Sequence, residues 1–387
     1  MASITGALFA AAGDGGERPA LICDDRTLSH AALRARIEAL ARALQSAGVR
    51  SGDRVAVLLP NCAEFVEAFF GITAIGAIVV PLNTRLHPGE HAGLLADCSP
   101  VLMIAASEYR ASAEHVAQRV PSVRSFVTVG PGGEDAAFPA YASWVGAHAG
   151  PMPQAEISSG SPAALLYTSG TTAQPKGVVL THGNYLADFR HVAAEAGIGP
   201  DGVNLQLSPL YHAACVHTLV HLVAGGSSVL MRRFDPAEVL ERIERHRVTY
   251  LFAVPTMLYE LLDHPGIGRH DIGSLRTVSY GAAAISGARL EQAQRVFGAK
   301  LLHAYGLTET TSHSSVLRAD EHRIAPGSIG RGIDDVQLRV VDELGRDLGP
   351  GEVGELLVKG PNVMAGYWNR PEETAHTLRG GWLHTGD

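Results

Sequence analysis

The chain has 387 residues, of which 46% are hydrophobic and only 18% charged, and its formal net charge is −8. These values exclude a disordered protein and predict two or three packed subdomains around a large core. The arginines are interspersed with acids, as in 241–245, so they predict solvated helix faces and exclude a nucleic-acid-binding surface.

The four cysteines stand far apart, and no two of them form a CxxC pair. This spacing is typical of reduced, mostly buried thiols and predicts a cytoplasmic protein. Two uncharged stretches, 68–84 and 202–231, are both interrupted by glycine and proline. Because a membrane span needs about 20 consecutive apolar residues, neither stretch is expected to cross a bilayer.

Strand patterns alternate with helix patterns along most of the chain, which predicts an α/β fold with mostly parallel sheets covered by helices. Ser29 is placed to cap the first of these helices, and Gly48 to close it. A Gly- and Pro-rich stretch at 130–161 is expected to be a surface connection. The expected strands are 54–59, 78–80, 248–254, 275–280 and 300–304, and the further helices are 65–75, 256–262 and 288–297.

Beyond about residue 324 the helix patterns stop, and strands 336–341 and 355–359 predict a hairpin-based β subdomain. We therefore expect three parts in chain order. They are a first α/β subdomain over 1–160, a second α/β subdomain over 161–323, and a β subdomain over 324–387.

A polar loop at 167–177 is rich in hydroxyls and glycine, and it contains Lys176, one of only three lysines in the chain. Backbone N–H groups, hydroxyls and a mobile ammonium are the groups that neutralise a polyphosphate. The loop is not a Walker A motif, because Pro175 precedes the lysine and the residues after it predict a strand. The alternative is a flexible hydroxyl-rich hairpin without a ligand.

Two further segments follow predicted strands. Small residues at 279–284 would let a flat ring approach the backbone, although ordinary strand-to-helix packing explains them as well. In the segment 303–310, Tyr305 offers a stacking face and Glu309 a carboxylate that suits Mg²⁺; the alternative for Glu309 is a surface helix cap. Asp387 could bind ribose hydroxyls, or it could be frayed as the last residue.

Histidines mark a third candidate region. Tyr211 and His212 precede the small residues 213–215 and could form the lip of an apolar pocket. His217 and His221 stand at i, i+4 on a predicted helix, where they could hold a metal. No glutamate lies between them and no third ligand is evident, so structural or pocket-lining histidines are favoured.

Together these motifs, in this order, resemble the adenylate-forming superfamily of acyl-CoA synthetases, luciferases and peptide-synthetase adenylation domains. The resemblance covers essentially the whole chain and implies the fold of their N-terminal domain, including a barrel-like β subdomain. It also implies a set of residues that bind ATP and Mg²⁺. The phosphates would contact Thr168, Ser169, Gly170, Thr171, Thr172 and Lys176; Mg²⁺ would contact Thr171 and Glu309; the adenosine would contact Gly281, Ala282, Ala283, Ala304, Tyr305, Gly306, Leu307, Thr308, Glu309 and, at the ribose, Asp387.

The implied reaction joins a carboxylate to ATP, giving an acyl-adenylate and pyrophosphate, after which coenzyme A displaces AMP. Lys176, Thr171, Glu309 and His212 would act in catalysis, with His212 beside the substrate carboxylate. The segment 211–214 has no acid to hold an amino group, and its small residues favour a medium-chain fatty or aromatic acid. The substrate pocket would comprise Tyr211, His212, Ala213, Gly281 and Gly306.

The chain departs from the family pattern twice. Ala173 stands where the family usually has glycine, which costs on the order of 1 kcal/mol if that position needs a positive φ. Family members also continue past the ribose-binding aspartate into a hinge and a lysine-bearing C-terminal domain, and the chain stops at Asp387. It is therefore expected to complete the thioester poorly, as a shortened chain or a naturally truncated relative.

Two alternatives remain at this point. A non-catalytic protein that binds ATP or an acyl-adenylate would also carry these motifs. A kinase or ATPase lacks support, because neither a Walker A helix nor a kinase catalytic loop is present. The expected partners are a small carboxylate, ATP and CoA, and a homodimer is a possible assembly.

Overall fold

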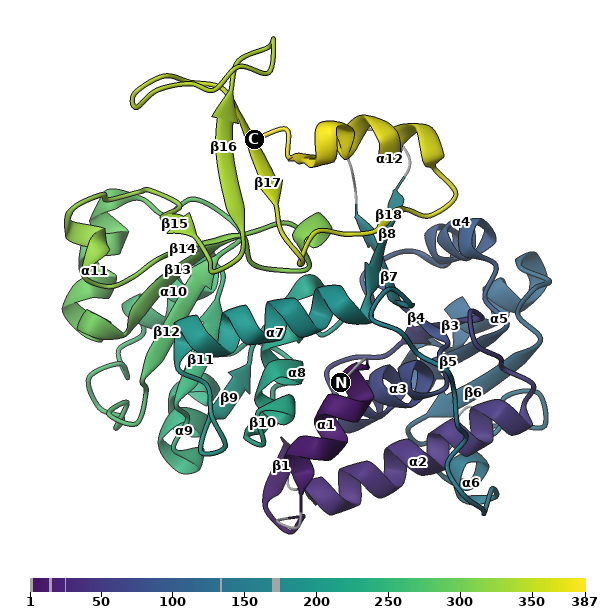
Figure 1. The fold of residues 1–387 in the computed structure, drawn as a ribbon. Coiled ribbons are helices and arrows are strands. Elements are labelled where there is room, and N and C mark those ends of the chain that lie inside the picture. Colours follow the sequence, from purple (N-terminus) through teal and green to yellow (C-terminus); the bar gives the residue numbers. More distant parts are fainter. Residues whose placement is uncertain (1–2, 14–15, 25, 133, 169–174) are drawn as a thin grey trace.

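The computed structural model describes residues 3–13, 16–24, 26–132, 134–168 and 175–387. Two large, mostly parallel sheets dominate it, and a small antiparallel sheet lies beside them (Figure 1). This arrangement confirms the predicted α/β class. The described helices, α1 to α12, are Ile4–Ala12, His30–Ser46, Ala63–Ala74, Pro88–Cys98, Arg110–Arg119, Tyr141–Gly146, His182–Ala196, Val216–Val223, Pro236–His246, Pro255–Asp263, Gly287–Phe297 and Pro371–Thr377.

The first sheet has seven strands, and its centre is parallel. Strands β8 and β18 at one edge run antiparallel to their neighbours. In spatial order the strands are β18 (Gly366–Tyr367), β8 (Lys176–Thr181), β7 (Pro162–Thr168), β4 (Ile78–Pro81), β3 (Arg54–Leu58), β5 (Leu102–Ala106) and β6 (Ser125–Val129).

The second sheet has nine strands and is parallel except at its two edges. In spatial order they are β15 (Arg331–Gly332), β14 (Ser315–Leu317), β13 (Leu301–Tyr305), β12 (Thr277–Gly281), β11 (Tyr250–Ala253), β9 (Val203–Gln206), β10 (Ser227–Leu230), β1 (Pro19–Cys23) and β2 (Arg26–Ser29). The sheets exchange strands across residue 160, since β1 and β2 join the second sheet while β7 and β8 join the first. The division into subdomains at 160 and 323 therefore stays a prediction.

Helix α1 contacts α3, α7 and α8 between the two sheets, and these four helices share one apolar core (Figure 1). The predicted cap of α2 is confirmed, because the Ser29 hydroxyl accepts a hydrogen bond from the Ala32 N–H. The connection at 130–161 is not featureless, since it contains α6, where Tyr141 is buried and donates a hydrogen bond to Glu67 over 2.9 Å. None of the helices in the described ranges has the length and apolar character to cross a membrane.

The C-terminal part is a three-stranded antiparallel sheet of β16 (Gln337–Val341), β17 (Glu355–Lys359) and β19 (Leu383–His384). The predicted hairpin is present, but a barrel-like subdomain is not confirmed. The expectation that helices stop beyond residue 324 is wrong, because α12 follows at Pro371–Thr377. Its sequence carries helix-start signals, with Pro371 in the first turn followed by Glu372 and Glu373 near the positive end of the helix dipole.

Candidate functional site

The polar loop connects two antiparallel strands. Strand β7 ends at Thr168, β8 begins at Lys176, and these two residues pair in the ladder. The predicted exit of the loop into a strand is confirmed, since Val178 and Val179 suit a pleated sheet. The predicted phosphate-binding residues Ser169, Gly170, Thr171 and Thr172 lie outside the described residues, as does Ala173.

Lys176 and Glu309 both contact Tyr367. The Lys176 Nζ lies 5.1 Å from the centre of the Tyr367 ring, and the Tyr367 hydroxyl donates a hydrogen bond to Glu309 Oε1 over 3.0 Å. Burial and the nearby Glu309 raise the pKa of Tyr367, so the phenol keeps its proton. Among the described residues the Tyr367 hydroxyl is the side-chain partner of Glu309 and no cation forms an ion pair with it, which leaves its carboxylate available to a hard cation.

Tyr305, the last residue of β13, meets Asp387, which follows β19 of the small antiparallel sheet. The Tyr305 hydroxyl donates a hydrogen bond to Asp387 Oδ2 over 2.5 Å, and burial followed by this contact raises the pKa of Tyr305. The Leu356 N–H also bonds the Asp387 carbonyl over 3.0 Å. Asp387 is therefore not frayed, and it lies at the end of β13, where a nucleotide was predicted.

Two glycines of the predicted site allow strand ends to approach one another. A Cβ on Gly281 would lie 2.1 Å from the Ala304 carbonyl oxygen, and one on Gly306 would lie 1.8 Å from that of Ser312. Ala282 follows with φ +66°, a left-handed conformation that costs about 1 kcal/mol for alanine, and its side chain is exposed together with that of Ala283. Strain of this kind is typical of functional loops.

Two cavities meet beside these elements. The larger cavity has a volume of about 790 Å³ and the smaller cavity about 400 Å³, and both are lined by Asn83, Tyr211, His212 and Thr308. The larger cavity also contacts Thr168 and Pro175 at the polar loop. Of the predicted site residues, the cavities bring together Thr168, Tyr211, His212, Ala213, Ala282, Ala304, Gly306, Leu307 and Thr308, whereas Lys176, Gly281, Ala283, Tyr305, Glu309 and Asp387 lie outside these linings.

A buried polar group behind the smaller cavity was missed by sequence reasoning. Asp188 on α7 is fully buried; its carboxylate accepts hydrogen bonds from the Ser312 hydroxyl over 2.6 Å and from the His313 N–H over 3.1 Å. Burial raises the pKa of Asp188 to about 7 and lowers that of His313 to about 4. No local motif marks these residues, because the two halves lie more than 120 residues apart.

His217 and His221, the candidate metal pair, lie on α8 as predicted. His217 lines the smaller cavity, whereas His221 is enclosed, with its Nδ1 2.7 Å from the His217 carbonyl. Burial lowers the pKa of both, so both rings are neutral near pH 7. In the described ranges, no three His, Cys, Asp or Glu side chains gather in a way that could hold a metal ion.

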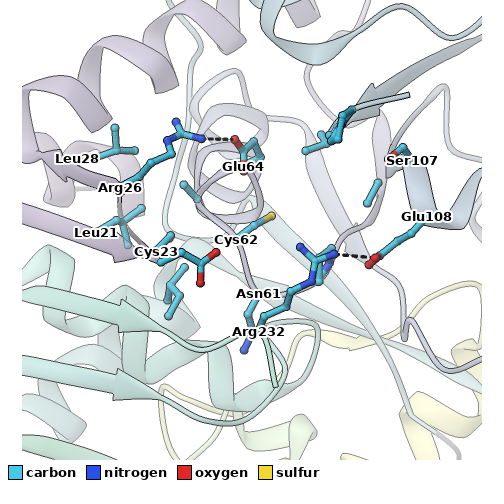
Figure 2. A pocket seen from close by; sticks show the side chains of 18 residues that line it. Leu21, Cys23, Arg26, Leu28, Asn61, Cys62, Glu64, Ser107, Glu108 and Arg232 are labelled. Atoms are coloured by element: carbon cyan, nitrogen blue, oxygen red, sulfur yellow. Dashed lines mark hydrogen bonds and ion pairs between the residues drawn. The ribbon is translucent and has the colours of Figure 1, made fainter. Parts of the chain in front are cut away.

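A third hollow lies elsewhere, between β1, the start of α3 and β10. This ion-paired cleft has a volume of about 430 Å³. Figure 2 shows that Arg26 faces Glu64 in it and Arg232 faces Glu108. The cleft also contains Cys23 and Cys62. Burial and nearby carboxylates raise the pKa of both thiols, that of Cys23 to about 12, so neither is an activated nucleophile.

Known proteins match the chain over nearly its whole length. A feruloyl-CoA synthase from Amycolatopsis sp is 38% identical over 93% of the chain and 70% of that protein. A medium/long-chain-fatty-acid–CoA ligase from Mycobacterium tuberculosis is 34% identical over 96% of the chain and 66% of that protein.

The solved N-terminal domain of FACL13 from Mycobacterium tuberculosis superposes with a TM-score of 0.91 at 27% identity, covering 100% of the chain and 96% of that structure. The anthranilate CoA ligase AuaEII in complex with anthranoyl-AMP gives the same TM-score at 25% identity, over 100% and 74%. The family model of AMP-binding enzymes matches residues 8–368. The chain therefore belongs to the family of AMP-binding enzymes.

Proposed function

We propose that the chain activates a hydrophobic carboxylic acid with ATP, giving an acyl-adenylate and pyrophosphate. A thiol, that of coenzyme A, then displaces AMP. The observation that carries the proposal is the junction of the two cavities at Tyr211, His212 and Thr308. One cavity begins at the polar loop and the other is largely apolar, so a phosphate chain and an acyl group could meet between them. The names of the relatives, a feruloyl-CoA synthase and a fatty-acid–CoA ligase, support an aryl or alkyl acid.

On the nucleotide side, the groups near the loop suit charge neutralisation. Lys176 supplies the ammonium, and Tyr305 with Asp387 supplies a ring face and a ribose acceptor beside Gly306. Mg²⁺ fits Glu309, whose carboxylate is fixed by a hydroxyl and not by a cation, and it would neutralise phosphate charge when bound. Thr171, its other proposed ligand, belongs to the undescribed part of the loop.

On the acid side, His212 lies at the junction, where a carboxylate must approach the α-phosphate. Burial, followed by the nearby charge of Arg85, lowers the pKa of His212, so its ring is neutral near pH 7. A neutral imidazole can donate one hydrogen bond to the attacking carboxylate without holding it as an ion pair. The chain's contribution is thus positioning of two reactants and neutralisation of the phosphate.

The test is ATP–pyrophosphate exchange over a panel of carboxylic acids, measured with this chain and with this chain continued by the C-terminal domain of a relative. Carboxylate-dependent exchange is expected, and its absence in both proteins would leave only an ATP-binding protein. Lys176→Ala should reduce exchange by about 100-fold or more, since an electrostatic group at the phosphate is removed. Lys300→Ala is the matched control, because Lys300 bonds the Ile272 carbonyl far from the cavities.

A further inference from the structure

The floor of the smaller cavity carries two imidazoles that lack a partner on their cavity side. His217 is 2% exposed and His313 4%, and both line the cavity. Each has its Nδ1 in a hydrogen bond, whereas Nε2 of neither has a partner within the described part of the chain. Neither Nε2 is among the fully enclosed unpartnered atoms, so both face the cavity space. A buried polar atom without a partner is costly, which makes it a specific demand on the ligand.

The hydrogen-bond chain behind His313 fixes its tautomer. At pH 8, where Asp188 is ionised, the Ser312 hydroxyl donates its one hydrogen to Asp188 Oδ2 over 2.6 Å. In the 2.5 Å hydrogen bond between Ser312 Oγ and His313 Nδ1, the imidazole must then be the donor, so its proton is on Nδ1. Nε2 of His313 consequently has no hydrogen, and its lone pair faces the cavity. It accepts a hydrogen bond and gives none.

His217 offers the opposite group. Its Nδ1 lies 2.8 Å from the Tyr250 hydroxyl, and a phenol donates more readily than a neutral imidazole. His217 Nε2 then carries the hydrogen. The two rings meet edge to face with centroids 5.4 Å apart, so an acceptor and a donor lie next to each other on the cavity floor.

The walls favour a flat group above this floor. The Phe252 ring stacks on His217 with centroids 4.6 Å apart and planes 20° apart, and both line the cavity. On the other side, Gly306 lies against the backbone of Ser312 and His313, so the polar floor begins close behind the segment expected to contact the acyl-adenylate. A ring therefore fits this space better than a long flexible chain.

We propose that the acid activated at this site is an aromatic carboxylic acid with a ring hydroxyl at the end remote from the carboxylate, held by His313 and His217. This inference rests on the proposed function. The hydroxyl donates to His313 Nε2 and accepts from His217 Nε2. An alkyl acid would leave both nitrogens unpaired, a methoxy group would leave His313 unpaired, and a second carboxylate has no proton for His313.

The primary test uses the unaltered chain and compares matched acids. Exchange is measured at pH 8, where Asp188 is ionised, with 4-hydroxycinnamate, 4-methoxycinnamate, cinnamate and octanoate, and binding of each acid is measured in parallel by calorimetry. The hydroxy acid is expected to exceed cinnamate and octanoate by about 100-fold or more in kcat/KM, with the methoxy acid well below it. Equal use of cinnamate or octanoate would overturn the inference and leave the proposed function intact.

A variant series locates the preference. His313→Leu should abolish the preference for hydroxy over methoxy acid, while His313→Gln, which can still accept, should restore part of it. His221→Leu is the matched control, because His221 is equally buried on α8 but does not line the cavity. If the preference survives in His313→Leu, His313 is not its source and the inference fails. If no acid supports exchange although ATP binds, the proposed function fails instead.

Discussion

The ion-paired cleft and the smaller cavity are hollows of nearly equal volume, about 430 and 400 Å³, yet they differ in how their polar groups are satisfied. In the cleft, Arg26, Glu64, Glu108 and Arg232 all have a partner of opposite charge on the chain itself. On the floor of the cavity, the imidazoles of His217 and His313 each keep one nitrogen without a partner among the described residues. Size therefore does not distinguish the two hollows, whereas their unmet hydrogen bonds do.

The largest expected effect concerns Asp188, the buried end of the hydrogen-bond chain behind the smaller cavity. Burial raises the pKa of Asp188 to about 7 from an ordinary 3.8, so between pH 4 and 7 the folded state holds a proton that the unfolded state has lost. Stability contributed by this group therefore falls as pH rises through that window, by roughly 4 kcal/mol in total. Groups facing Asp188 are Tyr185, Cys215, Tyr250 and His313.

Asp188→Asn, which resembles the protonated acid, is expected to lose this dependence. The measurement is urea unfolding of both proteins at pH 4.5, 6 and 8, and their difference in unfolding free energy isolates the Asp188 titration. A constant difference across the three pH values would contradict the raised pKa.

The second prediction concerns Glu309 and a carboxylate of the cleft. Glu309→Gln should lower pyrophosphate exchange by about 100- to 1000-fold, because a charge next to the phosphates is lost. Glu108→Gln removes a carboxylate whose partner is Arg232, and it should leave exchange unchanged. Titration of Mg²⁺ at fixed ATP checks the cause, since Glu309→Gln should raise the Mg²⁺ requirement. Similar losses in both variants would mean that the ion-paired cleft also takes part in the reaction.

The third prediction compares a glycine of each hollow. Gly306→Ala would place its Cβ 1.8 Å from the Ser312 carbonyl oxygen, and this backbone clash should cost about 3 kcal/mol and displace His313. Gly130 in the cleft has φ +95°, but an alanine methyl group there would lie 3.2 Å from its nearest neighbour, the Ser107 hydroxyl, so Gly130→Ala should cost only about 1 kcal/mol. Thermal unfolding of both variants measures the order, and a larger loss for Gly130→Ala would contradict it.

Local sequence signals predicted the frame of the site well. The strand after Lys176 followed from Pro175 and the β-branched residues behind the loop, and the strand ends carrying Gly281 and Tyr305 followed from runs of apolar residues. Helix α12 could also have been found, because its proline and two glutamates form a start signal. It was missed because the preceding strands suggested an all-β segment.

The floor of the smaller cavity could not be predicted in the same way. His313 acquires its role from Asp188, which lies 125 residues earlier on another element, and only packing of α7 against the second sheet joins them. The spacing of His217 to His221 favoured structural or pocket-lining histidines over a metal pair, but it carried no information about Tyr250 or Phe252. Contacts of this kind arise from tertiary structure, so local periodicity contains no trace of them.

The smallest expected effect sharpens the comparison most. Arg232 and Glu108 are 52% and 41% exposed and 2.7 Å apart, so water competes with their attraction and the pair should contribute at most about 1 kcal/mol. A double-mutant cycle of Arg232→Gln and Glu108→Gln measures this coupling by urea unfolding, and added salt should reduce it. Exchange with the preferred acid should be unchanged in all three variants. A coupling of several kcal/mol, or a tenfold loss of exchange, would mean that matched charges do not mark a hollow as merely structural. If the coupling is small and salt-sensitive, the charges of the cleft pair with one another and need no ligand. The unpaired nitrogens of the smaller cavity then remain the feature that distinguishes the two hollows.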